Sequence, residues 1–107
     1  MKYILGYSCA IMIFSVLIFA ENTDSMNAKK VFETYCWGCH HQSAEAFGPS
    51  FASIAAKRSA EEIEAMIADP EAMFLVLGYK RNAMPAFTLK DSELKAISEY
   101  ILSFKGK

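Results

Sequence analysis

The sequence predicts a single all-α domain built from four or five short helices. Its 107 residues are enough for one small domain. Apolar residues recur three and four positions apart in several segments, which places them on one face of a helix. No segment shows the sustained period-two alternation that a half-buried strand requires. The formal net charge of −1 argues against a strongly basic nucleic-acid binder, so no nucleic-acid partner is expected.

Residues 1–20 have the pattern of a secretory signal. Sixteen of these twenty residues are hydrophobic, Lys2 precedes the apolar run, and a polar segment follows Ala20. We expect cleavage after Ala20, which leaves 21–107 as the domain. An uncleaved anchor is the alternative, because the run would span about 27 Å as a helix, near the lower limit for a bilayer. Lipidation of Cys9 is disfavoured because that residue lies early in the run.

The first helix is predicted to run from the polar segment to about residue 35. Asp24 or Ser25 can cap its N-terminus. Its apolar face comprises Ala28, Val31, Phe32 and Tyr35. The helix leads directly to a pair of cysteines.

Residues 36–40 read Cys36-Trp37-Gly38-Cys39-His40. Cys-x-x-Cys-His is a signature of c-type haem attachment. The two thiols can form thioethers with the two vinyl groups of one porphyrin, and the histidine that follows can ligate the iron. The segment therefore predicts one covalent haem c.

Three other interpretations of this segment are weaker. A thioredoxin-like redox pair requires a βαβ pattern, which is missing from the sequence around the motif. A structural zinc site could use Cys36, Cys39, His40 and His41, but closed sites usually draw ligands from two separated segments. A simple disulfide leaves His40 without a role.

The middle of the chain is predicted to contain a loop and two short helices. The loop covers 42–53 and includes Gly48-Pro49. Ser59 and Glu62 form a capping box that opens a helix with Ile63, Met66 and Ile67 on its inner face. Asp69-Pro70 then starts a helix that ends at Gly78 and directs Met73, Phe74 and Leu77 inward.

A second loop, 79–88, precedes the last predicted helix. Thr88 or Asp91 can cap this helix, and Gly106 ends it. Its apolar face comprises Leu94, Ile97, Tyr100, Ile101 and Phe104.

The second axial ligand of the iron is predicted to be Met84. The candidates are Met26, Met66, Met73, Met84 and His41. A methionine at helical spacing usually serves packing, and His41 cannot reach the opposite face of the iron from beside His40. Met84 lies in a loop, and Pro85 keeps it out of helical geometry.

With these residues in place, the sequence resembles the small class I monohaem cytochromes c over residues 24–105. The likeness rests on Val31-Phe32 before the cysteine motif, on Gly48-Pro49, on the loop Asn82-Ala83-Met84-Pro85-Ala86-Phe87, and on Ile97, Tyr100 and Ile101. It implies a cytochrome c-like fold around one covalent haem c. It also implies that the carbonyl of Pro49 accepts the imidazole N–H of His40. The implied cofactor-binding residues are Cys36, Cys39, His40, Pro49 and Met84, with His40 and Met84 as iron ligands.

The resemblance also implies that Lys57 or Arg58 contacts a haem propionate. Two residues depart from the family pattern. Ala28 stands where a glycine is common at the crossing of the first and last helices, and His41 stands where small or polar residues are more usual.

Together these features predict an exported, periplasmic one-electron carrier between respiratory redox partners. With His40 and Met84 both on the iron, no coordination position remains for a substrate, so the chain is not expected to be an enzyme. The expected partners are an oxidase, a reductase or a quinol-oxidising complex, with membrane association only if the N-terminal segment is uncleaved. The alternatives are a haem-bearing subunit of a membrane respiratory complex, and a haem enzyme or gas-binding protein if Met84 is not a ligand.

Overall fold

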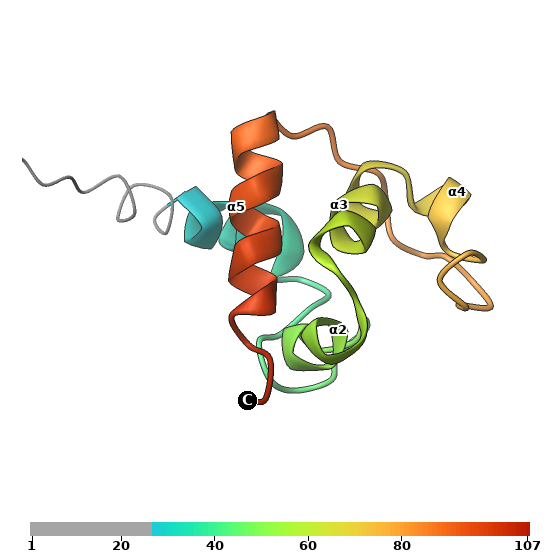
Figure 1. The fold of residues 1–107 in the computed structure, drawn as a ribbon, viewed down its shortest axis with the longest axis horizontal. Coiled ribbons are helices and arrows are strands. Elements are labelled where there is room, and N and C mark those ends of the chain that lie inside the picture. The colour runs from blue at the N-terminus through green and yellow to red at the C-terminus, as the bar shows by residue number, and fades with distance from the viewer. Residues whose placement is uncertain (1–26) are drawn as a thin grey trace, which may run out of the picture.

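Helices connected by loops make up the part of the chain that the computed structural model describes, residues 27–107 (Figure 1). A first helical segment, 27–31, continues into η1 (Phe32–Cys36) and is followed by α2 (Phe51–Lys57), α3 (Ala60–Ala68), α4 (Pro70–Met73) and α5 (Asp91–Leu102). This range contains no strand, so the predicted all-α class is confirmed. The predicted signal and the caps at Asp24 or Ser25 lie outside the described residues. None of the described helices is both long and apolar enough to cross a membrane.

The first helix widens just before the cysteines. Residues 27–31 are α-helical, whereas η1 is a π-helical turn in which the N–H of Trp37 donates to the carbonyl of Phe32 at 2.8 Å. Val31 and Phe32 are buried as predicted, but Tyr35 is 48% exposed. The prediction for Tyr35 was wrong because the spacing of an α-helix does not hold in the wider turn.

Helix α2 differs from the sequence prediction, which places a loop over 42–53. Ser50 caps the helix by accepting a hydrogen bond from the N–H of Ser53 at 3.0 Å. Phe51 and Ala55 are buried on its inner side. The helix has only seven residues, which is too few for its apolar residues to show a helical period in the sequence.

The predicted starts of α3 and α4 are confirmed. In α3 the side chains and backbone N–H groups of Ser59 and Glu62 form both hydrogen bonds of the capping box, at 2.9 and 3.1 Å. In α4, Asp69 is the cap and Pro70 occupies the first turn. Helix α4 ends earlier than predicted, at Met73, and the residues up to Gly78 form hydrogen-bonded turns of mixed spacing.

The last helix begins differently from the prediction. Asp91 is already helical, and Lys90 precedes it as the N-cap. The carboxylate of Glu93 accepts the N–H of Lys90 at 3.0 Å, so neither Thr88 nor Asp91 is the cap. Glu93 thereby satisfies a backbone N–H at the start of the helix that would otherwise bond to water.

The core lies where α5 packs against α2, α3 and the first helix (Figure 1). Ile97 is fully buried in α5. The ring of Tyr100 lies 5.7 Å from that of Phe32, so the aromatic residue of the last helix packs on the first helix. The hydroxyl of Ser98, also fully buried, donates to Glu64 of α3 at 2.9 Å. The first contact joins the first and last helices, and the second joins α5 to α3.

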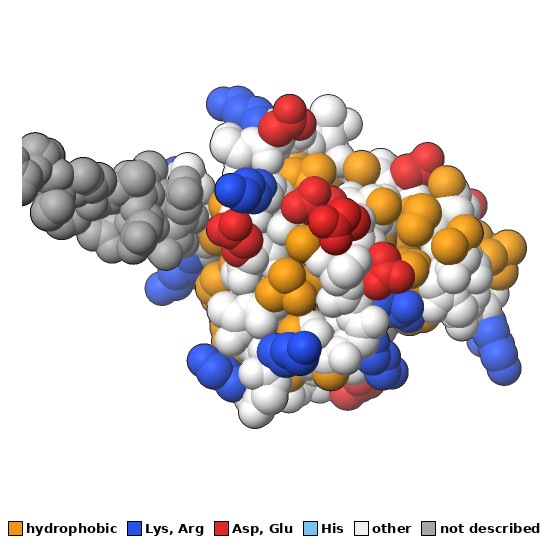
Figure 2. Space-filling view, in the orientation of Figure 1, with side chains coloured by type: hydrophobic (Ala, Val, Ile, Leu, Met, Phe, Trp, Pro, Cys, Tyr) orange, Lys and Arg blue, Asp and Glu red, His pale blue; other side chains and the backbone are white. Residues whose placement is uncertain are grey.

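Two large apolar side chains remain outside this core, in the turn after α4. Leu75 is 69% exposed and Val76 is 72% exposed. Figure 2 shows hydrophobic side chains gathered at this end of the molecule, with cationic side chains nearby. The α4 end is therefore the more apolar part of the face in view.

Candidate functional site

The cysteine motif lies in a tight turn that follows η1. The N–H of His40 donates to the carbonyl of Cys36 at 2.9 Å, and the N–H of Cys39 donates to the same oxygen at 3.1 Å. Both thiols are free. Cys39 is exposed, whereas burial raises the pKa of the Cys36 thiol to about 11. Both sulfurs are therefore available from one turn, and that of Cys36 is a protonated thiol at neutral pH.

The imidazole of His40 is fixed by a backbone carbonyl. Its Nδ1 lies 2.8 Å from the carbonyl oxygen of Pro49, the hydrogen bond that the family resemblance implies. The ring also stacks on Phe51, with the ring centroids 5.8 Å apart and the planes 27° apart. If Nδ1 carries the proton, Nε2 is left with a free lone pair for a metal ion.

Gly48 brings the Pro49 segment against the histidine. The N–H of Gly48 donates to the carbonyl of Cys39 at 2.7 Å. A β-carbon at this position would stand only 2.8 Å from Nδ1 of His40. Close approach to the imidazole, and not an unusual backbone angle, is what requires a glycine here.

Met84 lies in the long loop between α4 and α5. It is half-buried and packs against the hydrophobic core that contains Phe51. Because His40 stacks on Phe51, both predicted iron ligands border the same core. They come from loops 44 residues apart in the sequence.

Two further contacts tie the Met84 loop to the rest of the fold. The ring of Phe87 lies 5.5 Å from that of Tyr35 in η1. The N–H of Phe87 donates to the carbonyl of Ile67 in α3 at 3.1 Å. The exposed tyrosine therefore connects the cysteine segment with the loop that carries Met84.

Asn82 contacts Met84 through both ends of its side-chain amide. Its Oδ1 accepts the N–H of Met84 at 3.0 Å, and its Nδ2 donates to the Met84 carbonyl at 3.2 Å. Sequence reasoning did not single out Asn82. An asparagine two residues before a loop methionine was the available signal, because asparagine side chains often hydrogen-bond to backbone groups two residues away.

The two cations expected near the cofactor differ in their surroundings. Lys57 is exposed. Arg58 is half-buried, its Nη2 donates to the carbonyl of Leu77 at 2.6 Å, and its guanidinium lies over the ring of Tyr79 at 5.2 Å. The Nε of Arg58 is buried and has no hydrogen-bond partner. A buried donor of this kind calls for an acceptor that the protein itself does not supply.

His41 is half-buried, and its ring packs against the edge of Trp37 at 5.0 Å. The indole therefore covers part of the imidazole of His41. Within residues 27–107, histidine, cysteine and acidic side chains form no group of three that could hold a metal ion, so the four candidate zinc ligands do not converge.

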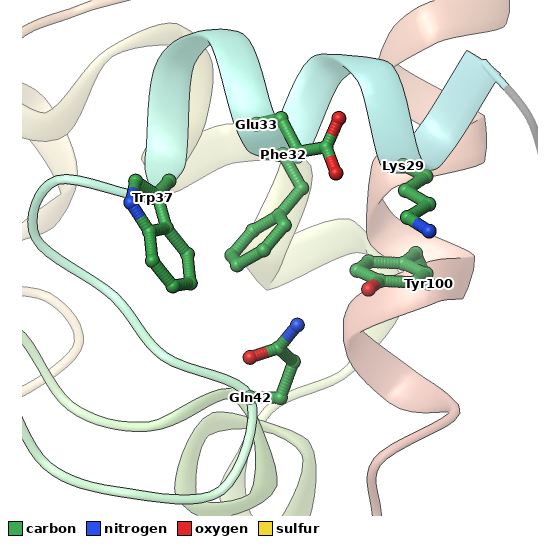
Figure 3. Close-up of a pocket in the computed structure, with 6 residues that line it drawn as sticks. All are labelled: Lys29, Phe32, Glu33, Trp37, Gln42 and Tyr100. Atoms are coloured by element: carbon green, nitrogen blue, oxygen red, sulfur yellow. The ribbon is translucent and has the colours of Figure 1, made fainter.

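A separate pocket of about 330 Å³ opens beside Trp37 (Figure 3). Phe32, Trp37 and Tyr100 form its aromatic walls, and Lys29, Glu33 and Gln42 are its polar lining residues. None of the five predicted site residues lines it. The pocket is therefore distinct from the predicted cofactor-binding residues.

Comparison with known proteins agrees with the sequence resemblance. The family model described as "Cytochrome c" matches residues 25–105. No curated protein matches the chain.

Two solved structures share its fold. A cytochrome c from Rhodothermus marinus is 18% identical with a TM-score of 0.62, and the match covers 90% of this chain and 89% of that one. An engineered cytochrome c from the same organism, bound to a carbene intermediate, is 20% identical with a TM-score of 0.64, and the match covers 92% of both chains.

Proposed function

The chain belongs to the cytochrome c family, and from that premise we propose that it carries single electrons between exported redox proteins. Membership implies one covalently bound haem c and the general role of a haem-bearing electron carrier. The identity of the iron ligands, the location of the protein and its partners are the parts that we add as proposals.

The residues of the site fit a haem. The two free thiols of Cys36 and Cys39 stand one helical turn apart, followed by a histidine whose ring is held in place. The partnerless Nε of Arg58 suits an anionic group such as a propionate. Cys36 and Cys39 would hold the porphyrin through thioethers, and His40 and Met84 would hold the iron.

When bound, the haem supplies a one-electron couple at its iron. The protein's part is to fix the ligands. The carbonyl of Pro49 keeps the proton on Nδ1 of His40, so that Nε2 is the ligating atom. A thioether from Met84 is a weak donor to ferric iron, which favours the ferrous state and a high reduction potential.

The observation that carries this proposal is the hydrogen bond between His40 and Pro49. A disulfide gives no reason for a histidine beside the cysteines to be oriented by a backbone carbonyl. A zinc site could use such a histidine, but within residues 27–107 the candidate zinc ligands do not converge. A haem ligand has this reason, because the bond sets the tautomer and the basicity of the imidazole.

The proposal of export rests on the sequence of residues 1–20. We propose a periplasmic location, by cleavage after Ala20 or by tethering through an uncleaved segment. The partners would be an oxidase, a reductase or a quinol-oxidising complex. A haem-bearing subunit of a membrane respiratory complex would show the same site, and native mass measurement of the solubilised membrane fraction separates it from a free carrier.

Carbon monoxide binding tests the carrier role against a gas-binding or enzymatic role. If Met84 closes the sixth coordination position, the ferrous holoprotein should show no spectral change on addition of carbon monoxide. The Met84→Ala variant should bind it readily, because the position is then open. Strong binding by the unmodified protein would contradict the carrier role.

A further inference from the structure

We infer that Asn82 is the positioning residue that holds Met84 at the iron, and that it does so by connecting the Met84 backbone to Glu71 of α4. The inference rests on the proposed function, because it takes Met84 as the axial ligand. It assigns a role to a residue that neither the cysteine motif nor the family match singles out.

The loop around Met84 has few bonds of its own. Within residues 80–89, the backbone N–H groups make one hydrogen bond to another backbone group, that from Phe87 to Ile67. Pro85 has no N–H to contribute. The loop therefore depends on side chains to fix the backbone from which the Met84 side chain projects.

The Asn82 amide supplies this restraint at Met84 itself. Its oxygen and nitrogen bond to the N–H and the carbonyl of the same residue, at 3.0 and 3.2 Å. Both backbone polar groups of Met84 are thus held by one side chain. Because a side chain projects from its own backbone, fixing both groups limits where the thioether sulfur can lie.

The same amide is anchored on the helix side. Nδ2 of Asn82 also donates to Oε2 of Glu71 at 2.9 Å, which uses its second hydrogen. Helix α4 provides a firm base, since Pro70 is fully buried and Asp69 caps the first turn. A hydrogen bond to a carboxylate is stronger than one between neutral groups. The chain of contacts runs from α4 through Asn82 to Met84.

Aspartate cannot replace asparagine in this arrangement. An aspartate at this position would still accept the N–H of Met84, but it would lose both donor bonds and face the carboxylate of Glu71. Changing Glu71→Gln in the same variant would place an amide at position 71. Its N–H could donate to the carboxylate introduced at position 82. This pair of changes reverses the polarity of the anchor and should recover part of its effect.

The test is a pH titration of the ferric holoprotein, in which the Met–iron charge-transfer band reports ligation, together with the reduction potential. Asn82→Ala removes the two hydrogen bonds to the Met84 backbone, each worth about 1 kcal/mol. Displacement of Met84 from the iron should therefore become roughly tenfold to thirtyfold easier. Its potential should fall as well. Asn82→Asp should show a loss of the same order, and the double variant with Glu71→Gln should lie closer to the unmodified protein.

Asn27→Ala is the matched control, because Asn27 is exposed on the first helix. The inference is overturned if the unmodified protein has the band and Asn82→Ala loses it at the same pH as Asn27→Ala. It is also overturned if Asn82→Ala lowers only the free energy of unfolding, since that is a purely structural effect. A missing band in the unmodified protein would instead contradict Met84 as the ligand, and with it the proposed function.

Discussion

Gly48 and His40 lie so close together that a β-carbon on Gly48 would stand 2.8 Å from Nδ1 and 3.0 Å from Nε2 of the imidazole. The contact is set by the fold of the loop, because the N–H of Gly48 is bonded to the carbonyl of Cys39. The next residue, Pro49, accepts the hydrogen bond from the same imidazole. Gly48 therefore determines how closely the orienting carbonyl can approach the histidine.

Substituting Gly48→Ala should push the imidazole away from Pro49. Overpacking of this kind costs about 1–3 kcal/mol, so the free energy of unfolding of the holoprotein should fall by about that amount. Denaturant unfolding measures it. Gly38→Ala is the control, because a β-carbon there meets no atom within 4 Å. Equal losses in the two variants would contradict the role given to the close contact.

Removing the charge of Arg58 should lower the reduction potential. A cation near the haem disfavours the more positive ferric state, so Arg58→Met should shift the potential down by roughly tens of millivolts. Lys57→Met removes the same charge from an exposed side chain and should shift it much less. A spectroelectrochemical titration compares the two. Equal shifts would show that Arg58 has no special relation to the cofactor.

Truncating Ile97 should be the most damaging single change in α5. The residue is fully buried in the core, and removing an isoleucine side chain down to alanine costs about 2–5 kcal/mol. Leu75→Ala should cost less than about 0.5 kcal/mol, because Leu75 is 69% exposed. Thermal or denaturant unfolding distinguishes them. A comparable loss in both variants would contradict the position of the core.

Removing the cap of α3 should have a moderate effect. Ser59 accepts the N–H of Glu62, and Glu62 accepts the N–H of Ser59. Ser59→Ala should therefore reduce the free energy of unfolding by about 0.5–2 kcal/mol. Ser43→Ala, in an exposed part of the loop, is the control and should be near neutral. An unchanged stability in Ser59→Ala would mean that the capping box adds nothing.

The parts of the fold that were predicted correctly depend on neighbouring residues in the sequence. The capping box at Ser59 and the Asp69-Pro70 start act over three residues, so the sequence displays them directly. Helix α2 was missed because seven residues give too little periodicity, and Tyr35 was misplaced because the π-helical turn changes the spacing. The start of α5 was misjudged because Glu93, and not a capping side chain, satisfies the helix end.

The residues of the site also separate into those that local sequence patterns predict and those whose contacts depend on the assembled fold. The cysteine motif and the Gly48-Pro49 segment are local patterns, and the sequence located them. The different surroundings of Lys57 and Arg58 depend on the contacts of Leu77 and Tyr79 with the guanidinium. The role of Asn82 needed its contact with Glu71, eleven residues away. Contacts between segments depend on the assembled fold and have no signature in the sequence.

The absorption spectrum of the purified ferric holoprotein tests the central claim most directly, because it reports whether Met84 ligates the iron opposite His40. The unmodified protein and Met73→Ala should both show the Met–iron charge-transfer band, and Met84→Ala should lack it. A band that persists in Met84→Ala, or that is missing from the unmodified protein, would contradict the account.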